Sequence, residues 1–192
     1  MILSDRTIKK RLQTGEIKID PFFEEQLQPS SYDVTLDKDF LVFDTTKTQI
    51  IDPRKNITQA MRKVISTEED PFILHPNEFA LAATQEIVGV DGKHLVVLNG
   101  KSSLGRLGLL IHATAGFIDP GNELRITLEL FNVATVPILL YPGMKIAQVV
   151  FEEISEHCER QYGHPDLKSK YYKDQGVKAS FMHENFIENN DN

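Results

Sequence analysis

The chain has 192 residues, with 21 lysines and arginines against 28 aspartates and glutamates, so its formal net charge is −7. This acidic balance argues against a protein that coats DNA or RNA, and no apolar run reaches the ~20 residues of a membrane span. Apolar residues make up 41 % of the chain, which excludes a chain disordered throughout and suffices for one globular domain.

The chain begins with a pattern that predicts a short helix. Ser4 or Asp5 can accept hydrogen bonds from the free N–H groups of a first helical turn, and Gly15 is a suitable stop. We therefore expect a helix over about residues 4–13.

Beyond the helix the pattern changes to short apolar or alternating runs, separated by Gly, Pro or Asn every 8–12 residues from residue 71 onward. This is typical of an all-β sandwich or barrel, and no long helical period supports a doubly wound α/β fold. The polar stretch 44–70 is expected to be irregular, with one short helix near 58–64. The expected strands are 32–36, 40–43, 72–74, 79–84, 95–98, 109–112, 125–132, 138–141 and 146–151.

From about residue 160 the apolar periodicity is lost and the local charge changes sign. A solvated tail is the plain interpretation of such a segment. The alternative is a basic segment that meets an anion, because only Asp166 and Asp174 oppose the cations between 160 and 180. The basic and tyrosine residues concerned are Arg160, Tyr162, Lys168, Lys170, Tyr171, Tyr172, Lys173 and Lys178.

The stretch Gly100–Gly108, GKSSLGRLG, combines two hydroxyls, two cations and three small flexible residues. Glycines let backbone N–H groups approach an anion, hydroxyls donate hydrogen bonds, and Lys or Arg neutralises charge. The stretch therefore suits a phosphate cradle, although the order of residues differs from a P-loop. A Gly- and Ser-rich turn between strands explains it equally well.

Residues 112–121, HATAGFIDPG, place small residues around Phe117 and Asp119. A tight hairpin here can press its backbone against a flat ring and read the ring edge through main-chain groups. An ordinary turn at Asp119-Pro120-Gly121 is the simpler interpretation.

Glu129 lies in the expected strand 125–132, where alternation puts it on one face with Thr127 and Phe131. A carboxylate there is either exposed to solvent or buried for a reason, and a buried one can act as a general base. From the strand alone, simple exposure is the favoured interpretation.

Metal-binding and cysteine signatures are missing from the sequence. The six histidines show no metal-ligand spacing, and the zinc-deaminase pattern His-x-Glu…Pro-Cys-x-x-Cys is absent. The single cysteine, Cys158, excludes intramolecular disulfides and suits a reducing, cytoplasmic compartment.

Taken together, the motifs resemble the dCTP deaminase family, within the wider group that includes the trimeric dUTPases. The resemblance runs through nearly the whole chain in family order. It is carried by Met1–Asp5, Gln28–Val34, Gly100–Gly108, Thr114–Gly121, Thr127–Glu129, Pro142–Ile146, Ser169–Tyr171 and Gln175–Gly176.

The resemblance implies a mainly β fold, a distorted β-barrel or jelly roll of the dUTPase-like type with short peripheral helices. It implies a single domain over 1–192, with an N-terminal helical segment at 1–20 and a flexible C-terminal lid and tail from about 160. It further implies a homotrimer with active sites shared between subunits. The reaction implied is a zinc-independent hydrolytic deamination of dCTP, with Mg²⁺ held mainly by the triphosphate and with no protein metal ligand. Nucleic acid and membrane are not expected as partners.

The resemblance also assigns roles to individual residues. Glu129 matches the general base, Ser102 and Arg106 match residues that position the water and the base, and Asp119 matches a carboxylate near the deoxyribose. Ala115 matches a position whose backbone carbonyl holds the water. The positions implied to bind substrate are Lys101, Ser103, Gly116, Phe117, Ile118, Gln148, Tyr162, Lys170, Tyr171, Gln175 and Lys178, the last five in the segment that closes over the triphosphate.

One pair of residues separates two branches of the family. Deaminase-only relatives commonly have His-Arg where this chain has Gly116-Phe117, which resembles bifunctional members that release dUMP and pyrophosphate. In that case Asp119 is the candidate that activates the second water, and dTTP is a possible inhibitor. A deaminase that releases dUTP is the alternative, followed by a dUTPase-only enzyme and a catalytically silent nucleotide-sensing module.

The chain departs from the family at residues 122–125. Asn122-Glu123-Leu124-Arg125 replaces the more usual aromatic-Ser-Gly pattern. The conformation of this turn is therefore open at the level of sequence, whereas the position of Glu129 is unaffected.

Overall fold

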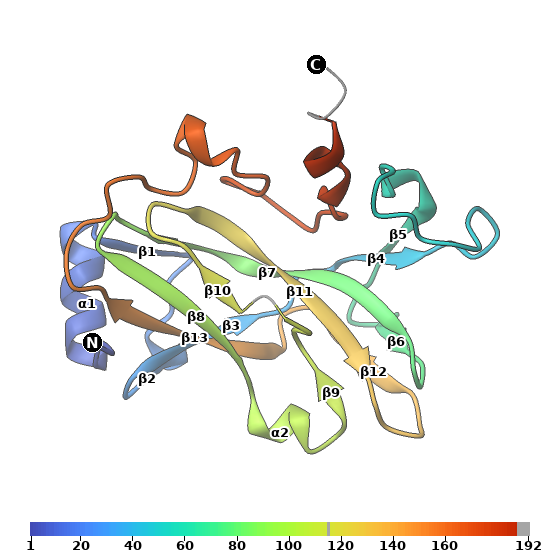
Figure 1. The fold of residues 1–192 in the computed structure, drawn as a ribbon. Helices are drawn as coiled ribbons and strands as arrows, with labels where there is room; N and C mark the ends of the chain where they lie inside the picture. Colours follow the sequence, from blue (N-terminus) through green and yellow to red (C-terminus); the bar gives the residue numbers. More distant parts are fainter. Residues whose placement is uncertain (115, 188–192) are drawn as a thin grey trace.

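The computed structural model describes residues 1–114 and 116–187, which form two larger β-sheets and one small one (Figure 1). The six-stranded sheet is built around two long antiparallel strands, β7 and β11, which pair along most of their length. Its strands are β1 (Ile17–Asp20), β4 (Asp39–Phe43), β5 (Met61–Ile65), β7 (Phe79–Val90), β9 (Leu109–Leu110) and β11 (Glu123–Asn132).

The five-stranded sheet has β8 and β13 at its centre, and a separate pair of short strands makes the third sheet. The larger sheet contains β2 (Leu27–Gln28), β3 (Ser31–Thr35), β8 (His94–Gly100), β10 (Phe117–Ile118) and β13 (Lys145–Glu153), and the pair is β6 (Phe72–Leu74) with β12 (Ile138–Leu140). The helices are α1 (Asp5–Thr14), α2 (Ser102–Gly105) and the 3₁₀ turns Glu24–Gln26, Thr58–Ala60, Pro165–Leu167 and Met182–Phe186.

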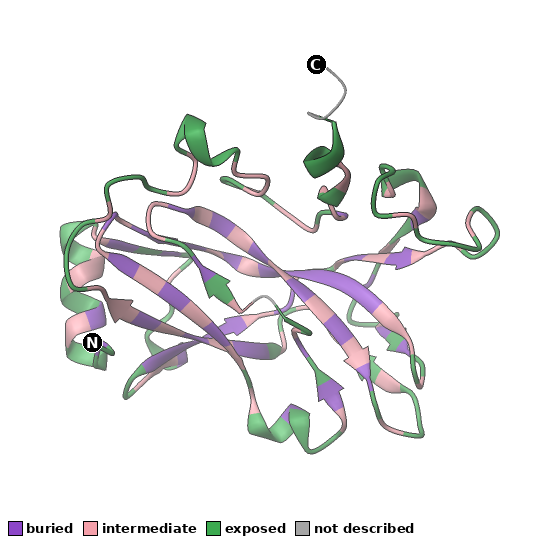
Figure 2. Cartoon of the chain, in the orientation of Figure 1, coloured by how far each residue is buried: buried purple, intermediate pink, exposed green. Residues whose placement is uncertain are grey.

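The core lies between the sheets because the long strands alternate. In β11, Leu124, Ile126, Leu128 and Leu130 are buried, whereas the residues between them are half-buried and face outward. Figure 2 shows the same alternation of buried and partly exposed segments along the strands. This alternation leaves Glu129 on the outer face of the six-stranded sheet.

The structure confirms the mainly β class and the first helix. The helix occupies Asp5–Thr14 and ends at Gly15, whose φ of 76° is the left-handed conformation that glycine adopts readily. The two larger sheets meet at one isolated bridge, Leu36–Thr84, and within residues 1–114 and 116–187 they stay separate ladders without closing into a barrel.

The expected helix near 58–64 is wrong. Only Thr58–Ala60 is helical, as a single 3₁₀ turn, and Met61–Ile65 is strand β5, paired with β4. A cross-strand partner 18 or more residues away outweighs a weak local helical preference, and this partner is invisible to local pattern. In the described part of the chain no helix is long and apolar enough to cross a membrane.

Candidate active site

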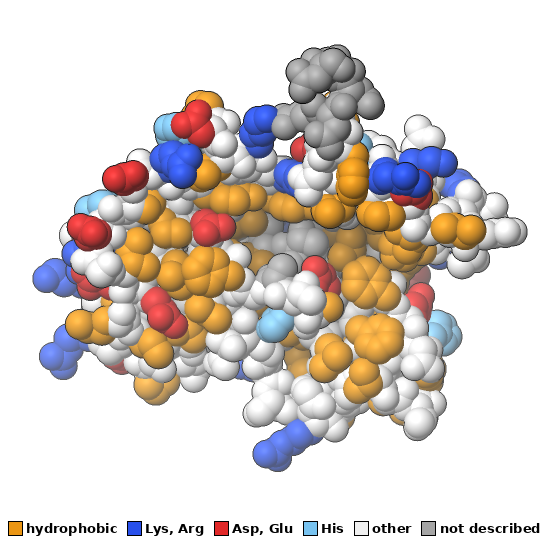
Figure 3. Space-filling view, in the orientation of Figure 1, with side chains coloured by type: hydrophobic (Ala, Val, Ile, Leu, Met, Phe, Trp, Pro, Cys, Tyr) orange, Lys and Arg blue, Asp and Glu red, His pale blue; other side chains and the backbone are white. Residues whose placement is uncertain are grey.

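A cavity of about 530 Å³ lies between the outer face of the six-stranded sheet and the C-terminal segment. Figure 3 shows the surface hollowed below that segment, with apolar side chains along the rim. Seven of the residues proposed from the sequence line this cavity: Phe117, Ile118, Asp119, Glu129, Tyr162, Tyr171 and Lys178.

Glu129 is held at the cavity by the loop that follows β9. Its Oε2 accepts hydrogen bonds from the backbone N–H groups of Ala113, at 2.8 Å, and Thr114, at 3.2 Å. Its own N–H donates to the carbonyl of Ile111 at 3.1 Å. Hydrogen bonds from two backbone donors fix the orientation of the carboxylate. The half-buried carboxylate is therefore ordered, which an exposed strand glutamate is not.

Asp119 stands on the turn between β10 and β11. The turn is closed by the Asn122 N–H, which donates to the Asp119 carbonyl at 3.3 Å, and Gly121 has the positive φ of 86° that the sequence Asp-Pro-Gly favours. Desolvation raises the pKa of the Asp119 carboxyl. Phe117–Ile118 is strand β10, but it pairs with β8 in the five-stranded sheet, whereas β11 belongs to the six-stranded sheet, so among the described residues this stretch forms no hairpin with the strand that follows it. The carbonyl of Gly116, just before β10, accepts from Leu98 N–H at 2.7 Å. Ala115 lies outside the described residues.

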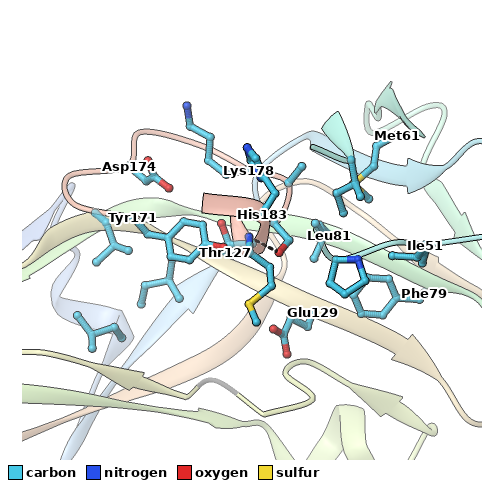
Figure 4. Close-up of a pocket in the computed structure, with 18 of the residues that line it drawn as sticks. Ile51, Met61, Phe79, Leu81, Thr127, Glu129, Tyr171, Asp174, Lys178 and His183 are labelled. Atoms are coloured by element: carbon cyan, nitrogen blue, oxygen red, sulfur yellow. Dashed lines mark hydrogen bonds between the residues drawn. The ribbon is translucent and has the colours of Figure 1, made fainter. Parts of the chain in front are cut away.

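The C-terminal segment crosses the mouth of the cavity, linked internally by two tyrosine hydroxyls. The Tyr162 hydroxyl accepts from Tyr171 N–H at 3.3 Å, and the Tyr171 hydroxyl accepts from Phe181 N–H at 3.0 Å. Burial, with the nearby charge of Asp119, raises the pKa of Tyr162. Figure 4 shows Tyr171, Asp174 and Lys178, which come from the C-terminal segment, and Glu129, which comes from β11, around this cavity.

Two other residues expected in the lid face elsewhere. Lys170 Nζ donates to the side chain of Asn185, and Gln175 is exposed, with its amide bonded to the Lys173 carbonyl at 3.0 Å. Neither lines the cavity. Within one copy of the chain, the lid therefore brings three of its five proposed residues to the cavity.

The residues of the Gly100–Gly108 stretch form a second group, apart from the cavity. Ser102–Gly105 of the stretch form α2, and Arg106 is its C-cap residue. Ser102, Ser103 and Arg106 are exposed, and none of the three lines the cavity. Figure 1 shows α2 on the opposite side of the molecule from the C-terminal segment.

Lys101 and Gln148 are anchored beside this second group. Lys101 Nζ lies 2.6 Å from Asp33 Oδ1, and Gln148 Oε1 is 3.2 Å from the Ser31 hydroxyl. Asp33 is buried and also pairs with Lys145 Nζ at 3.3 Å. One copy of the chain thus presents two separate sets of proposed site residues.

Comparison with known proteins shows the family of the chain. The model of the family described as dCTP deaminase-like matches residues 2–154, which include Glu129, Asp119 and the Gly100–Gly108 stretch but not the C-terminal segment. The chain belongs to the dCTP deaminase-like family. The resemblance seen in the sequence motifs is confirmed.

Relatives of this dCTP deaminase-like chain are similar over almost their full length. It is 47 % identical over 187 residues to the protein named dCTP deaminase, dUMP-forming, of Clavibacter michiganensis subsp. michiganensis, with 97 % of this chain and 93 % of that protein covered. The protein of the same name from Mycobacterium ulcerans is 48 % identical over 187 residues, with 97 % of this chain and 98 % of that protein covered.

A solved structure shares the fold. The crystal structure of 2′-deoxycytidine 5′-triphosphate deaminase from Agrobacterium tumefaciens superposes with a TM-score of 0.63 at 20 % identity. The match covers 80 % of this chain and 48 % of that one, so this chain spans about half the length of the solved chain.

Several cavity residues of this family member were missed by the sequence analysis. Phe79 and Leu81 on β7 reach the cavity because they pair with Phe131 and Glu129 on β11, so they share its outer face. Only the strand register reveals this. Asp174 also lines the cavity, and its pKa is raised by burial, an effect that Lys178 partly opposes. In the sequence, the one signal for Asp174 is that it stands as an acidic residue among the cations of the C-terminal segment.

Proposed function

We propose that the chain deaminates dCTP and hydrolyses the triphosphate, giving dUMP, pyrophosphate and ammonia. The names of relatives at 47 and 48 % identity support this activity. The observation that carries the proposal is the ordered Glu129 carboxylate in a cavity that also carries Asp119. With two carboxylates in one cavity, each of the two hydrolytic steps on the nucleotide can have its own general base.

In the first step, Glu129 acts as general base. It takes a proton from the water that attacks C4 of the cytosine ring, and the C4–N bond to the amino group then breaks. One proton of the water goes to ring N3 and the other to the leaving nitrogen, so uracil and ammonia form from cytosine and one water. A positioned acid–base group of this kind typically contributes ~10²–10⁴-fold to the rate.

Three further residues are proposed to position this water and the cytosine ring. Ser102 and Arg106 supply a hydroxyl and a guanidinium to the water and the ring, and the Ala115 carbonyl accepts a hydrogen bond from the water. Gly116, Phe117 and Ile118 are proposed to pack their backbone against the ring.

In the second step, Asp119 acts on another water. It takes a proton as the water oxygen attacks the α-phosphorus, and the bond between that phosphorus and the bridging oxygen breaks to release pyrophosphate. A carboxyl with a raised pKa is a stronger base than an ordinary aspartate, and desolvation raises the pKa of Asp119.

The triphosphate is proposed to bind between basic and tyrosine residues of both sets. Tyr171 and Lys178 line the cavity, so this part of the proposal rests on their position. Lys101, Ser103, Gln148, Tyr162, Lys170 and Gln175 complete the set proposed from the sequence. These lysines gather positive charge at one site, which explains how a chain of net charge −7 can bind a triphosphate.

Because Ser102 and Arg106 are exposed and lie apart from the cavity, we propose that a second copy of the chain supplies them. Each site of a homotrimer would then combine the Glu129 cavity of one copy with α2 of its neighbour. Closed cyclic assemblies commonly build sites at such repeated interfaces.

Mg²⁺ is proposed as the cofactor, held mainly by the phosphate oxygens of the substrate. Asp119 and Asp174 line the same cavity, and their carboxyl oxygens are compatible with a nearby Mg²⁺ that the phosphates hold. Bound there, the ion supplies positive charge that offsets the phosphates. A thymidine triphosphate shares the triphosphate and a product-like ring, so dTTP is proposed to compete for this site.

The test is product analysis of the purified protein with dCTP and Mg²⁺, resolving dUTP, dUMP and pyrophosphate. The proposal expects dUMP and pyrophosphate in equal amounts without free dUTP. Accumulating dUTP would assign a deaminase-only enzyme, and turnover of added dUTP without turnover of dCTP would assign a dUTPase.

A further inference from the structure

The turn residue Asn122 has a role that the proposed reaction does not use. It sits where the chain departs from the aromatic residue usual in the family, directly after Asp119-Pro120-Gly121. Its side chain is only 4 % exposed. A buried amide needs hydrogen-bond partners, so the partners of Asn122 indicate what the residue does.

The Asn122 side-chain oxygen joins the turn to the C-terminal segment. Oδ1 accepts from its neighbour Glu123 N–H at 2.9 Å and from Lys173 N–H at 3.2 Å. The Asn122 backbone carbonyl accepts from Val90 N–H at 3.0 Å, which anchors the turn to β7. The amide oxygen therefore connects a strand-bound turn to a segment 51 residues later in the chain.

A second hydrogen bond follows immediately. Arg125 N–H, near the start of β11, donates to the Asp174 carbonyl at 2.8 Å. Lys173 itself has a φ of 57°, a left-handed conformation that a non-glycine residue keeps only when its surroundings hold it there. Two consecutive residues of the segment are thus pinned to the β10–β11 turn and to β11.

Lys173 and Asp174 lie between Tyr171 and Lys178, the two residues of the C-terminal segment that are proposed to bind the triphosphate and that line the cavity. Tyr171 precedes Lys173 by two positions and Lys178 follows it by five, and both line the cavity together with Asp119 and Asn122. Fixing Lys173 therefore fixes where the triphosphate-facing side chains stand relative to Asp119. A phenylalanine or tryptophan side chain at position 122 has no acceptor for the Lys173 N–H.

We propose that Asn122 is a positioning residue, a clip that holds the C-terminal segment over the cavity through the Lys173 N–H. Its effect on turnover rests on the proposed function, because it acts through Tyr171 and Lys178. The clip itself is a property of the free protein and can be measured without substrate.

The experiment compares three variants of the full-length protein by amide hydrogen exchange. Asn122→Leu keeps the volume and removes the acceptor, and Asn122→Asp restores an acceptor that is at least as strong. Asn132→Asp is the matched control at the far end of β11, where it removes the amide bonds to the Leu74 and Val136 carbonyls.

We expect exchange at Lys173 to rise about five- to tenfold in Asn122→Leu, which corresponds to one lost hydrogen bond. Asn122→Asp should restore protection, and Asn132→Asp should lower the melting temperature without changing exchange at Lys173. In steady-state assays with dCTP, Asn122→Leu should raise KM more than it lowers kcat. The substitution affects the C-terminal segment that is proposed to bind the triphosphate, and it leaves the general bases Glu129 and Asp119 in place.

Unchanged protection at Lys173 in Asn122→Leu, or protection lost equally in Asn122→Asp, would overturn the clip. A wild-type protein with no dCTP turnover would overturn the proposed function instead. The exchange result would then still decide the clip, because it needs no substrate.

Discussion

Glu129 and Ala113 are joined by a 2.8 Å hydrogen bond from the backbone N–H of Ala113 to the Glu129 carboxylate. The bond ties a residue of β11 to the loop that follows β9. It fixes which way the carboxylate points before any substrate arrives. Preorganisation of this kind is what a general base requires.

Glu129→Gln should abolish deamination while leaving nucleotide binding largely intact. The amide keeps the shape of the side chain but cannot take a proton from water, so we expect a loss of at least ~10²-fold in ammonia release. Binding of dCTP by calorimetry should change little. The matched control is Glu123→Gln on the same strand, which removes only a surface ion pair with Lys18. Deamination at the wild-type rate in Glu129→Gln would contradict the proposed mechanism.

Asp119→Asn should separate the two steps. Without the second base, dCTP should still lose ammonia, and dUTP should accumulate because attack at the α-phosphorus slows by an estimated ~10²-fold or more. Chromatography of the nucleotides over time shows which species builds up. Continued release of dUMP and pyrophosphate at the wild-type rate would exclude Asp119 as the second base.

The pKa shifts of Asp119 and Asp174 predict a pH-dependent effect on stability. Burial raises both pKa values above the ordinary 3.8, so the folded state holds these protons more tightly than the unfolded state. The stabilising contribution is complete below pH 3.8 and is lost as the pH rises through the folded pKa values. At pH 7 both variants, Asp119→Asn and Asp174→Asn, should therefore melt at a higher temperature than wild type. Thermal melts from pH 3 to 8 test this, and a lower melting temperature at pH 7 in both would contradict it.

Mixing two inactive variants tests whether sites are shared between copies. Arg106→Ala lacks the guanidinium at the C-cap of α2, and Glu129→Gln lacks the general base. After random exchange of subunits in a trimer, roughly a quarter of shared sites have both residues intact, so activity should return to about that level. Sites made within one chain would regain none.

Removing the chain after Arg160 should abolish triphosphate turnover without unfolding the sheets. The described part of the removed segment, residues 161–187, contains no strand, whereas it carries Tyr162, Tyr171 and Lys178. Its loss uncovers Met61 and Leu81, which Ala179 packs against. Circular dichroism and light scattering should show a folded protein of unchanged oligomeric state. Loss of the folded assembly would mean that the segment is structural.

How much could be predicted from the sequence differs between elements. The helix at Asp5–Thr14 and the strand carrying Glu129 follow from patterns confined to neighbouring residues. Strand β5 was mistaken for a helix, and β1 and β10 were missed, because these short strands exist only through partners elsewhere in the chain: β4, β7 and β8. Local pattern carries no information about such partners.

The sequence by itself determined the mainly β class, the family and the residue types of the site, because alternation and ordered motifs are written along the chain. The tertiary structure alone decided that Glu129 is held by the loop at Ala113, that α2 lies away from the cavity, and that Asn122 meets Lys173. Each of these is a contact between distant segments. Such contacts depend on strand register and on the path of the C-terminal segment, neither of which a one-dimensional pattern contains.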